Sequence, residues 1–254
     1  MKKQLVLLCL AAILLSCEQT DLPGNITYEK STITDCEGNE YLTVKIGDQW
    51  WMAENLRCAK YDTESPQADK TIVLSGSTVV FTPYHVRISA TTNSILSGTG
   101  VNHSVNLTEE QRAKMGYLYN WAAALGLENG LVDTVFVAKQ QGICPNGWHI
   151  PNDEEWTMLT DYISKKGDGK YKTVTGWFDN NKPTENDAAF AVLPAGYAQG
   201  RIMRSVGFNA NFLSSTGWAI RGSLGRSLTY SAEGMEKYIE VKSYANSVRC
   251  VKND

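Results

Sequence analysis

The sequence predicts an α+β domain, and three observations support this prediction. Runs of alternating apolar and polar residues, such as 41–46, occur toward both ends of the chain and are separated by turn-forming pairs. Two segments with helical character lie between these strand groups, at 117–125 and 152–166. No repeat of fixed period is visible. Two groups of short strands that flank two main helices, joined by long loops, are typical of an α+β fold.

The first 16 residues have the pattern of a secretory signal peptide. A basic start at Lys2 and Lys3 precedes the apolar run 5–15, whose eleven residues fall short of the about 20 that a membrane-spanning helix needs. Residues 14–17 resemble a lipobox, the motif in which a cysteine is acylated and becomes the new N-terminus. We therefore predict a lipid anchor on Cys17. An ordinary signal peptide with an incidental cysteine is the alternative.

The segment 17–31 is polar and contains a Pro-Gly turn, which predicts a lipidated tether between the membrane and a domain over 32–254. Loss of Lys2 and Lys3 leaves 22 basic against 27 acidic residues, so the mature chain is mildly acidic. This balance argues against a nucleic-acid partner. The expected location is the outer membrane, with the domain at the cell surface or facing the periplasm.

Four cysteines remain in the predicted mature domain, namely Cys36, Cys58, Cys144 and Cys250. An even count in an exported chain suggests two disulfides, although four cysteines allow three pairings. We favour Cys36–Cys58, which brackets one compact strand unit, and Cys144–Cys250, which ties the last strand to the central turn. No Cys-x-x-Cys spacing occurs and the histidines are scattered, so no metal centre or cofactor is predicted.

The start of the domain is predicted to be a three-stranded meander. The alternating run 41–46 lies between a Gly-Asn turn at 38–39 and a Gly-Asp turn at 47–48. From 59 to 107 the pattern loosens into Ser/Thr/Gly clusters with short strand-like runs. A segment of this length inside a compact domain is usually a functional loop or an insertion, so we predict an insertion that contacts partners.

The central stretch 142–156 is the predicted pivot of the fold. A turn at 146–147 and Pro151 predict a tight reversal followed by an abrupt helix start. Asn152 is a good N-cap with Glu155 three residues later, and the helix should end before Gly167. These acidic residues therefore indicate helix capping rather than catalysis.

Two further helices are expected upstream of the pivot. Thr108 has the sequence of a capping box for a short helix that ends near Gly116. The following segment, 117–125, predicts a buried helix ended by Gly126.

The later part of the chain contains the candidate ligand contacts. Tryptophans near turns and arginines in a glycine-containing loop can stack on or hydrogen-bond a ligand. The candidates are Trp177, Tyr197, Arg201, Arg204 and Trp218. Oxygen-rich loops offer a possible structural Ca²⁺ site, although such residues usually serve turns. Those residues are Asp168, Asp179, Asn180 and Asp187.

Five separated pieces of the chain resemble the Fibrobacter succinogenes major paralogous domain, a family of bacterial surface lipoprotein domains. The pieces are 38–41 with 44–49, 51–56, 116–121, 144–156 and 247–251, with weaker matches at 193–197 and 214–216. They occur in order from about Ile33 to Lys252. One departure is Leu213, where the family usually has tryptophan.

The resemblance implies a fold similar to C-type lectin-like domains, with twisted antiparallel sheets, two helices and a disulfide from the final strand to the central region. It implies little about activity, because the family is mostly uncharacterised and presumed to bind or adhere. The Glu-Pro-Asn, Gln-Pro-Asp and Trp-Asn-Asp motifs of calcium-dependent lectins are absent.

We expect a lipid-anchored surface module without catalytic activity, whose loops at 59–107 and 176–226 bind a glycan or a surface protein. A purely structural role in a surface assembly is a variant of this hypothesis. An enzyme is the alternative from a different class, since sulfatase-modifying enzymes share the lectin-like fold in outline. An enzyme of this kind requires reactive cysteines near a substrate cleft.

Overall fold

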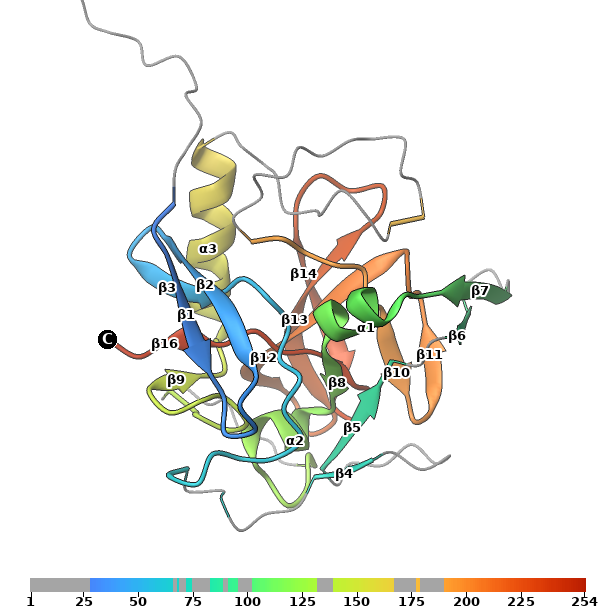
Figure 1. The fold of residues 1–254 in the computed structure, drawn as a ribbon, viewed down its shortest axis with the longest axis horizontal. Coiled ribbons are helices and arrows are strands. Elements are labelled where there is room, and N and C mark those ends of the chain that lie inside the picture. The colour runs from blue at the N-terminus through green and yellow to red at the C-terminus, as the bar shows by residue number, and fades with distance from the viewer. Residues whose placement is uncertain are drawn as a thin grey trace, which may run out of the picture.

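The computed structural model describes residues 28–65, 68, 72–74, 83–88, 91–95, 102–131, 139–166, 177–178 and 190–254. Within these ranges, three sheets and three short helices form an α+β fold (Figure 1). None of the described helices has the length and apolar character needed to cross a membrane. The predicted signal peptide, Cys17 and the four candidate Ca²⁺ ligands lie outside the described residues.

The first sheet contains the predicted meander and the end of the chain. Its order is β1 (Lys30–Thr34), β2 (Glu40–Ile46), β3 (Gln49–Met52), β16 (Val251–Lys252) and β9 (Trp148–His149). All its pairings are antiparallel. The predicted three-stranded start is therefore confirmed, and it closes against the C-terminus and the pivot.

The other two sheets are assembled from distant segments. The seven-stranded sheet has the order β14 (Glu236–Val241), β13 (Gly222–Thr229), β12 (Asn209–Trp218), β15 (Asn246–Ser247), β8 (Tyr117–Tyr119), β5 (Tyr84–Arg87) and β4 (Val73–Leu74). The four-stranded sheet has the order β10 (Tyr197–Gln199), β11 (Ile202–Arg204), β6 (Thr91–Ile95) and β7 (Asn102–Asn106). Both contain parallel pairs, so the sheets are mixed rather than purely antiparallel.

Strands β4 to β7 fall within the segment predicted to be an insertion. The structure places β5 beside β8 in the large sheet, and β6 beside β11 in the small one. Figure 1 shows β6 and β7 at one end of the molecule, next to β10 and β11. This segment therefore supplies strands to two sheets.

The helices are α1 (Glu109–Met115), α2 (Trp121–Leu125) and α3 (Asp153–Lys166). Thr108 and Gln111 form the predicted capping box of α1. At α3, the Asn152 side chain accepts a hydrogen bond from the Glu155 backbone N–H at 2.9 Å, and the Glu155 carboxylate accepts one from the Asn152 N–H at 2.9 Å. The predicted start of α3 is therefore confirmed.

The predicted helix over 117–125 is wrong in its first third. Tyr117–Tyr119 is strand β8, which pairs with β5 and β15, and only Trp121–Leu125 is helical. Asn120 separates the two elements, because its side chain accepts a hydrogen bond from the Ala123 N–H and caps α2. Pairing partners far away in sequence therefore outweighed the local helical pattern.

A buried arginine joins the first and last segments of the domain. Arg249 is 1% exposed, and its Nε donates to Asn55 Oδ1 at 2.8 Å while Nη2 donates to the Ala191 carbonyl at 2.8 Å. Burial lowers the pKa of Arg249 to about 9. The guanidinium also lies over the Phe190 ring, 4.3 Å from its centroid. This contact set fixes β15 and β16 against the segment that follows β3.

The two predicted cysteine pairs have different outcomes. Cys144–Cys250 is a disulfide, as predicted. Cys36 and Cys58 are not bonded, and their Sγ atoms lie 3.6 Å apart. The Cys58 thiol donates to the Lys60 carbonyl at 3.0 Å, so in this structure backbone acceptors hold these thiols. The prediction of a second disulfide is corrected accordingly.

Candidate functional site

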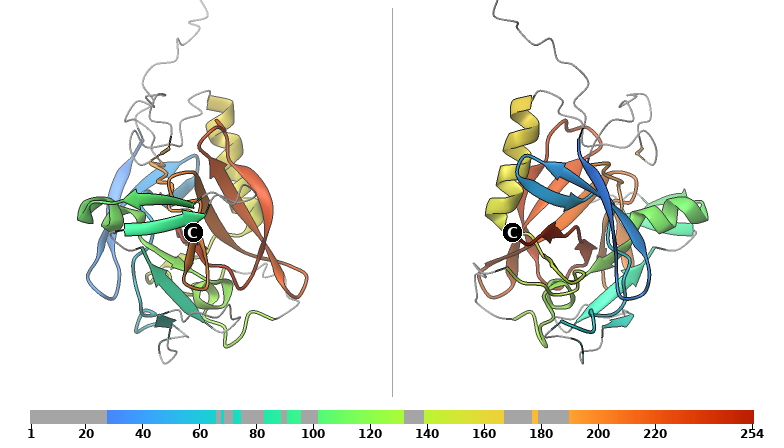
Figure 2. Two further views of the ribbon diagram at one scale, coloured as in Figure 1. Left: turned by 90° about the vertical axis from the view of Figure 1, so that its right-hand side faces the viewer. Right: turned by 60° about the vertical axis from the view of Figure 1, so that its left-hand side comes forward.

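Strands β12, β13 and β14 form a ribbon at one edge of the seven-stranded sheet, and its two faces differ in character. Side chains alternate between the faces of a strand. Arg226 pairs with Lys237 on one face, and Gly225 pairs with Tyr238 on the other. Figure 2 shows α3 lying along the ribbon. We call the face with Arg226 the helix face and the face with Tyr238 the tyrosine face.

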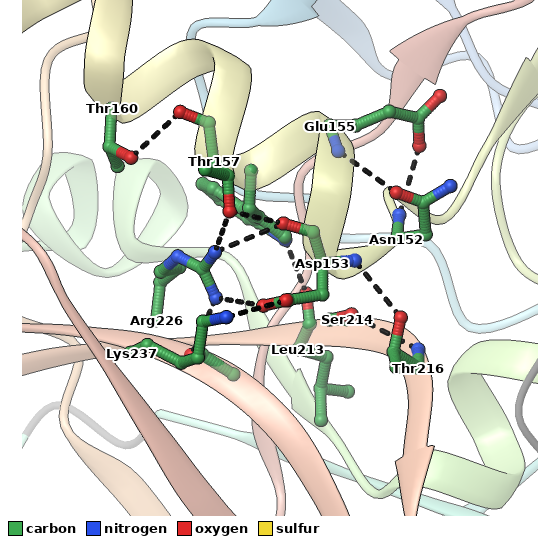
Figure 3. Close-up of polar contacts among 12 residues, drawn as sticks. Asn152, Asp153, Glu155, Thr157, Thr160, Leu213, Ser214, Thr216, Arg226 and Lys237 are labelled. Atoms are coloured by element: carbon green, nitrogen blue, oxygen red, sulfur yellow. Dashed lines mark hydrogen bonds and ion pairs between the residues drawn. The ribbon is translucent and has the colours of Figure 1, made fainter.

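The helix face is held by the first turn of α3, as Figure 3 shows. Arg226 donates from Nη1 to Asp153 Oδ1 at 2.6 Å, and from Nη2 to Thr157 Oγ1 at 2.9 Å. Lys237 donates to Asp153 Oδ2 at 2.7 Å. Burial raises the pKa of Asp153, but Lys237 and Arg226 outweigh this effect and hold it below its ordinary value. Every charge in this group has an opposite partner, so the group fixes the ribbon.

The tyrosine face carries polar and aromatic side chains, and not all of its polar groups have partners. Tyr238 and Glu240 project from β14, two residues apart and therefore on one side of the strand. Their partners on β13 are the small residues Gly225 and Ser223. A Cβ atom on Gly225 would lie 2.8 Å from the Tyr238 ring, so this ring covers the glycine.

The β10–β11 hairpin adds further residues to this region. Tyr197 pairs with Arg204 across the hairpin, and the Arg204 Nε donates to Gln199 Oε1 at 3.0 Å. The Tyr197 ring stacks on the Tyr244 ring, with centroids 5.8 Å apart and planes 19° from parallel. Ala198 is hydrogen-bonded to Ala245 in both directions, which fixes the hairpin against the segment after β14.

We call the resulting group the tyrosine cluster, and it consists of Tyr197, Arg204, Tyr238, Glu240, Tyr244 and Asn246. Its first five members are half-buried, and Asn246 is fully buried. The cluster therefore combines stackable rings, a carboxyl group and a guanidinium at a partly accessible surface, together with a buried amide. This combination is suited to binding a polar ligand that has flat apolar faces.

Glu240 is the acidic residue of the tyrosine cluster, and its pKa is shifted. Burial raises the pKa of Glu240 to about 7, although hydrogen bonds from the Val241 backbone N–H and from Tyr238 act in the opposite direction. Burial also raises the pKa of Tyr244, and the negative charge of Glu240 adds to this rise. The Glu240 carboxyl group therefore changes its charge near neutral pH.

Two buried polar atoms, one in the cluster and one next to it, have no hydrogen-bond partner in the described part of the chain. They are the Asn246 Nδ2 and the Ser223 Oγ. Ser223 is the register partner of Glu240, and the Asn246 Oδ1 lies 3.5 Å from the Tyr238 hydroxyl. Unpaired buried polar groups cost free energy, so their presence here is consistent with a binding function.

The sequence-predicted ligand residues divide into three groups. Tyr197 and Arg204 belong to the cluster, and Arg201 lies exposed at the turn of the same hairpin. Trp218 is 55% exposed at the end of β12, on the helix face beside Val241. Trp177 is 5% exposed and packs in the core with Trp156 and Phe190, so its prediction as a ligand contact is wrong.

Sequence reasoning missed Tyr238, Glu240 and Tyr244. The run 238–243 has the pattern of a strand, and the period of two in a strand places Tyr238 and Glu240 on one face. Their meeting with Tyr197 depends on the β10 contact with the segment at Ala245, for which the sequence contains no local signal.

The histidine of the pivot is also fully engaged in pairing. The His149 Nε2 lies 2.8 Å from Glu155 Oε1, and its Nδ1 lies 2.6 Å from Asn253 Oδ1. His149 is 1% exposed. Among the residues with described positions, no three His, Cys, Asp or Glu side chains form a group suited to a metal ion.

Comparison with known protein families identifies one match. The model of the Fibrobacter succinogenes major domain matches residues 44–252. Comparisons with curated proteins and with solved structures found no match. The matched range contains the pivot, all of the tyrosine cluster and the Cys144–Cys250 disulfide.

Proposed function

The chain belongs to the Fibrobacter succinogenes major domain family, and from this premise we propose that it is a lipid-anchored cell-surface module that binds a glycan through the tyrosine cluster. The predicted signal peptide and the acylation of Cys17 supply the anchor in this proposal. The domain would be held at the outer membrane and exposed to the surroundings of the cell. A C-type lectin-like fold is part of the same proposal.

The stacked pair of Tyr197 and Tyr244 is the observation that carries this proposal. Aromatic rings bury the apolar faces of sugar rings and bring little conformational entropy cost. Sugar hydroxyl groups need donors and acceptors around such a platform. The neighbouring half-buried Arg204 and Glu240 provide both kinds of group.

The partly accessible position of the cluster also favours binding over a purely structural role. A structural polar group is usually fully paired, as Asp153 is with Arg226 and Lys237 on the helix face. The tyrosine face instead contains a desolvated carboxyl group and the unpaired Nδ2 of Asn246. A ligand that pairs the Glu240 carboxyl group would recover part of its desolvation cost.

The available observations give less support to an enzyme. An enzyme similar to the sulfatase-modifying enzymes would need a reactive cysteine, but Cys144 and Cys250 are disulfide-bonded. Burial raises the pKa of both Cys36 and Cys58, which favours the unreactive thiol form. We therefore infer that the module acts by binding and not by catalysis.

A glycan array with the purified protein tests this proposal, run with and without Ca²⁺. We expect a reproducible hit, and we expect Tyr244→Ala to weaken that binding about tenfold because stacking is lost. Tyr162→Ala is the matched control, since Tyr162 is also half-buried but lies on α3.

Three outcomes would contradict the proposal in different ways. A folded protein that binds no glycan would point to a protein partner or a structural role. Full binding by Tyr244→Ala would remove the cluster as the site. Loss of binding in Trp218→Ala alone would move the site to the exposed end of β12.

A further inference from the structure

The outer edge of β14 is a second interaction feature of the ribbon, because β14 is the last strand of its sheet in the described ranges. The Lys242 N–H donates to the Arg221 carbonyl at 2.8 Å, in the same register as the pairs of β13 and β14. Hydrogen-bonded and non-hydrogen-bonded pairs alternate in an antiparallel ladder. The N–H and C=O groups of Lys237, Ile239 and Val241 therefore point away from β13, to the outer edge.

This edge is open at two of the three residues. At Val241, the N–H donates to Glu240 Oε1 at 2.7 Å, and the carbonyl accepts from the Tyr244 N–H at 2.8 Å. The outer backbone groups of Lys237 and Ile239 have no hydrogen-bond partner elsewhere in the described ranges. Two N–H and two C=O groups are therefore available to pair with an extended chain.

An apolar patch adjoins the open edge. It consists of Trp218, Ile220, Ile239 and Val241, which are 55%, 52%, 55% and 38% exposed. Ile239 and Val241 lie on the helix face with Lys237, because side chains alternate along a strand. A Cβ atom on Gly222 would lie 3.3 Å from Ile239 Cγ2, and Gly222 is the register partner of Trp218. Exposed apolar side chains gathered in this way mark an interaction site, whereas scattered ones do not.

The hairpin end that carries Trp218 has a fixed backbone. Ala219 has a φ of 60°, in the left-handed region that residues other than glycine rarely adopt. The buried Lys242 ammonium donates to the Ala219 carbonyl at 3.1 Å and lies 4.0 Å from the centroid of the Trp121 ring. These contacts hold the turn in place, so little ordering of the backbone is needed when a partner covers Trp218.

The charge next to Ile239 favours an acidic side chain in the partner. Arg226 and Lys237 share one carboxylate, that of Asp153, so this group carries a net positive charge. The Lys237 side chain is 51% exposed and has room for a further carboxylate. Exposed ion pairs contribute little affinity, so this charge would select among partners and would not supply most of the binding free energy.

We propose that β14 binds an extended peptide segment of a partner protein, which adds a strand to the sheet through the open backbone groups of Lys237 and Ile239. Alternate apolar side chains of the peptide cover Ile239 and Val241, and an acidic side chain faces Lys237. In strand addition, main-chain hydrogen bonds supply the affinity and alternate side chains supply the specificity. The edge and the apolar patch provide one surface for each of these.

A second copy of this chain fits the edge less well than such a peptide. An antiparallel pair of β14 strands that uses the same open groups places Lys237 of each copy opposite Ile239 of the other. In this register Glu236 of each copy faces Glu240 of the other. Above pH 7, where Glu240 is mostly charged, these like charges are destabilising.

An NMR titration of the isotope-labelled protein with the synthetic peptide acetyl-Val-Lys-Val-Thr-Asp-Thr-amide tests the proposal. In the antiparallel register its valines face Val241 and Ile239, its lysine faces Glu240 and its aspartate faces Lys237. The titration is run above pH 7, where Glu240 is mostly charged. We expect saturable shifts of the Lys237 and Ile239 amide signals, and their absence would overturn the proposal.

N-methylated peptides test the hydrogen bonds of the added strand one at a time. Methylation of the second valine, whose N–H faces the Ile239 carbonyl, should weaken binding about tenfold or more. Methylation of the next residue, the threonine, should leave the affinity unchanged, because its N–H points away from β14. Equal effects at the two positions, or no effect at either, would overturn strand addition.

The variant Ile239→Lys should also weaken peptide binding about tenfold, because it removes the apolar side chain beside the open edge. Its matched control is Ile202→Lys, since Ile202 is 48% exposed on β11 of another sheet. An equal loss in both variants would overturn the proposal. A peptide-free protein that sediments as a dimer, with Ile239→Lys as a monomer, would assign the edge to a second copy and overturn it as well.

This proposal does not rest on the proposed function of the tyrosine cluster, and its test separates the two. Tyr244→Ala keeps the backbone N–H that bonds the Val241 carbonyl, so it should leave peptide binding unchanged. Conversely, Ile239→Lys should retain any array hit that depends on Tyr244, because the Ile239 side chain lies on the helix face.

Discussion

The two faces of the β12–β14 ribbon differ in how their polar groups are satisfied. On the helix face, Asp153 is paired with both Arg226 and Lys237. On the tyrosine face, Glu240 is desolvated and Asn246 has an unpaired Nδ2. One face of these three strands therefore carries a group that stabilises the fold, and the other carries Glu240, which with Asn246 of β15 belongs to a group that is only partly paired.

This difference gives a criterion for separating structural residues from binding residues. A buried ion is stabilising only when a partner and hydrogen bonds offset its loss of hydration, as they do around Asp153. Polar groups that remain partly unpaired lower stability, and they persist where they serve another role. Changes on the helix face should therefore affect stability, whereas changes on the tyrosine face should affect binding and pH dependence.

The largest expected effect is on the helix face. Arg226→Met removes the cation whose side chain is 3% exposed and leaves the Asp153 carboxylate with Lys237 alone. We expect the free energy of unfolding to fall by about 3 kcal/mol, as for other broken buried ion pairs. Urea denaturation measures this change.

Arg226→Lys is the control for the charge itself. It keeps one cation but loses the second hydrogen bond, from Nη2 to Thr157. Its free energy of unfolding should lie between that of the wild type and that of Arg226→Met. A loss below about 1 kcal/mol for Arg226→Met would mean that the helix face does not fix the ribbon.

An intermediate effect is expected for Glu240 on the tyrosine face. Its pKa is about 7 in the folded protein, above the ordinary value of 4.5. Between these values the folded state holds a proton that the unfolded state has lost, so stability falls as the pH rises through this window. After allowance for solvent screening, the expected loss is about 1–2 kcal/mol.

Glu240→Gln should remove this pH dependence, because glutamine does not titrate. Thermal unfolding of both proteins at pH 4.5 and pH 7.5 measures the difference. If the wild type and the variant lose stability in parallel across this window, Glu240 does not have the raised pKa.

The smallest effect is expected for Lys237, which is exposed although it shares Asp153 with Arg226. Its side chain is 51% exposed, so Lys237→Gln should cost only about 0.5 kcal/mol. Added salt should shrink this difference further. A salt-independent loss as large as that of Arg226→Met would contradict the ranking of the two cations.

Much of the fold follows from local sequence signals. The capping pair Asn152 and Glu155 predicted the start of α3, and the turns around 41–46 predicted the first meander. These signals can be recognised in the sequence because caps and turns depend on residues within a few positions of each other. Of the candidate site, only Tyr197 and Arg204 were identified, since they lie together on one hairpin.

Tertiary structure decided the features that depend on distant partners. It buried Trp177 in the core, turned Tyr117–Tyr119 into a strand and left Cys36 and Cys58 as thiols. It also brought Tyr197 and Glu240 to the same residue, Tyr244, through a contact between Ala198 and Ala245. The sequence by itself determined the family, the turns and the capped helices, because those are local patterns. Which side chains meet at a surface was decided by packing, because burial and long-range pairing outweigh local preference.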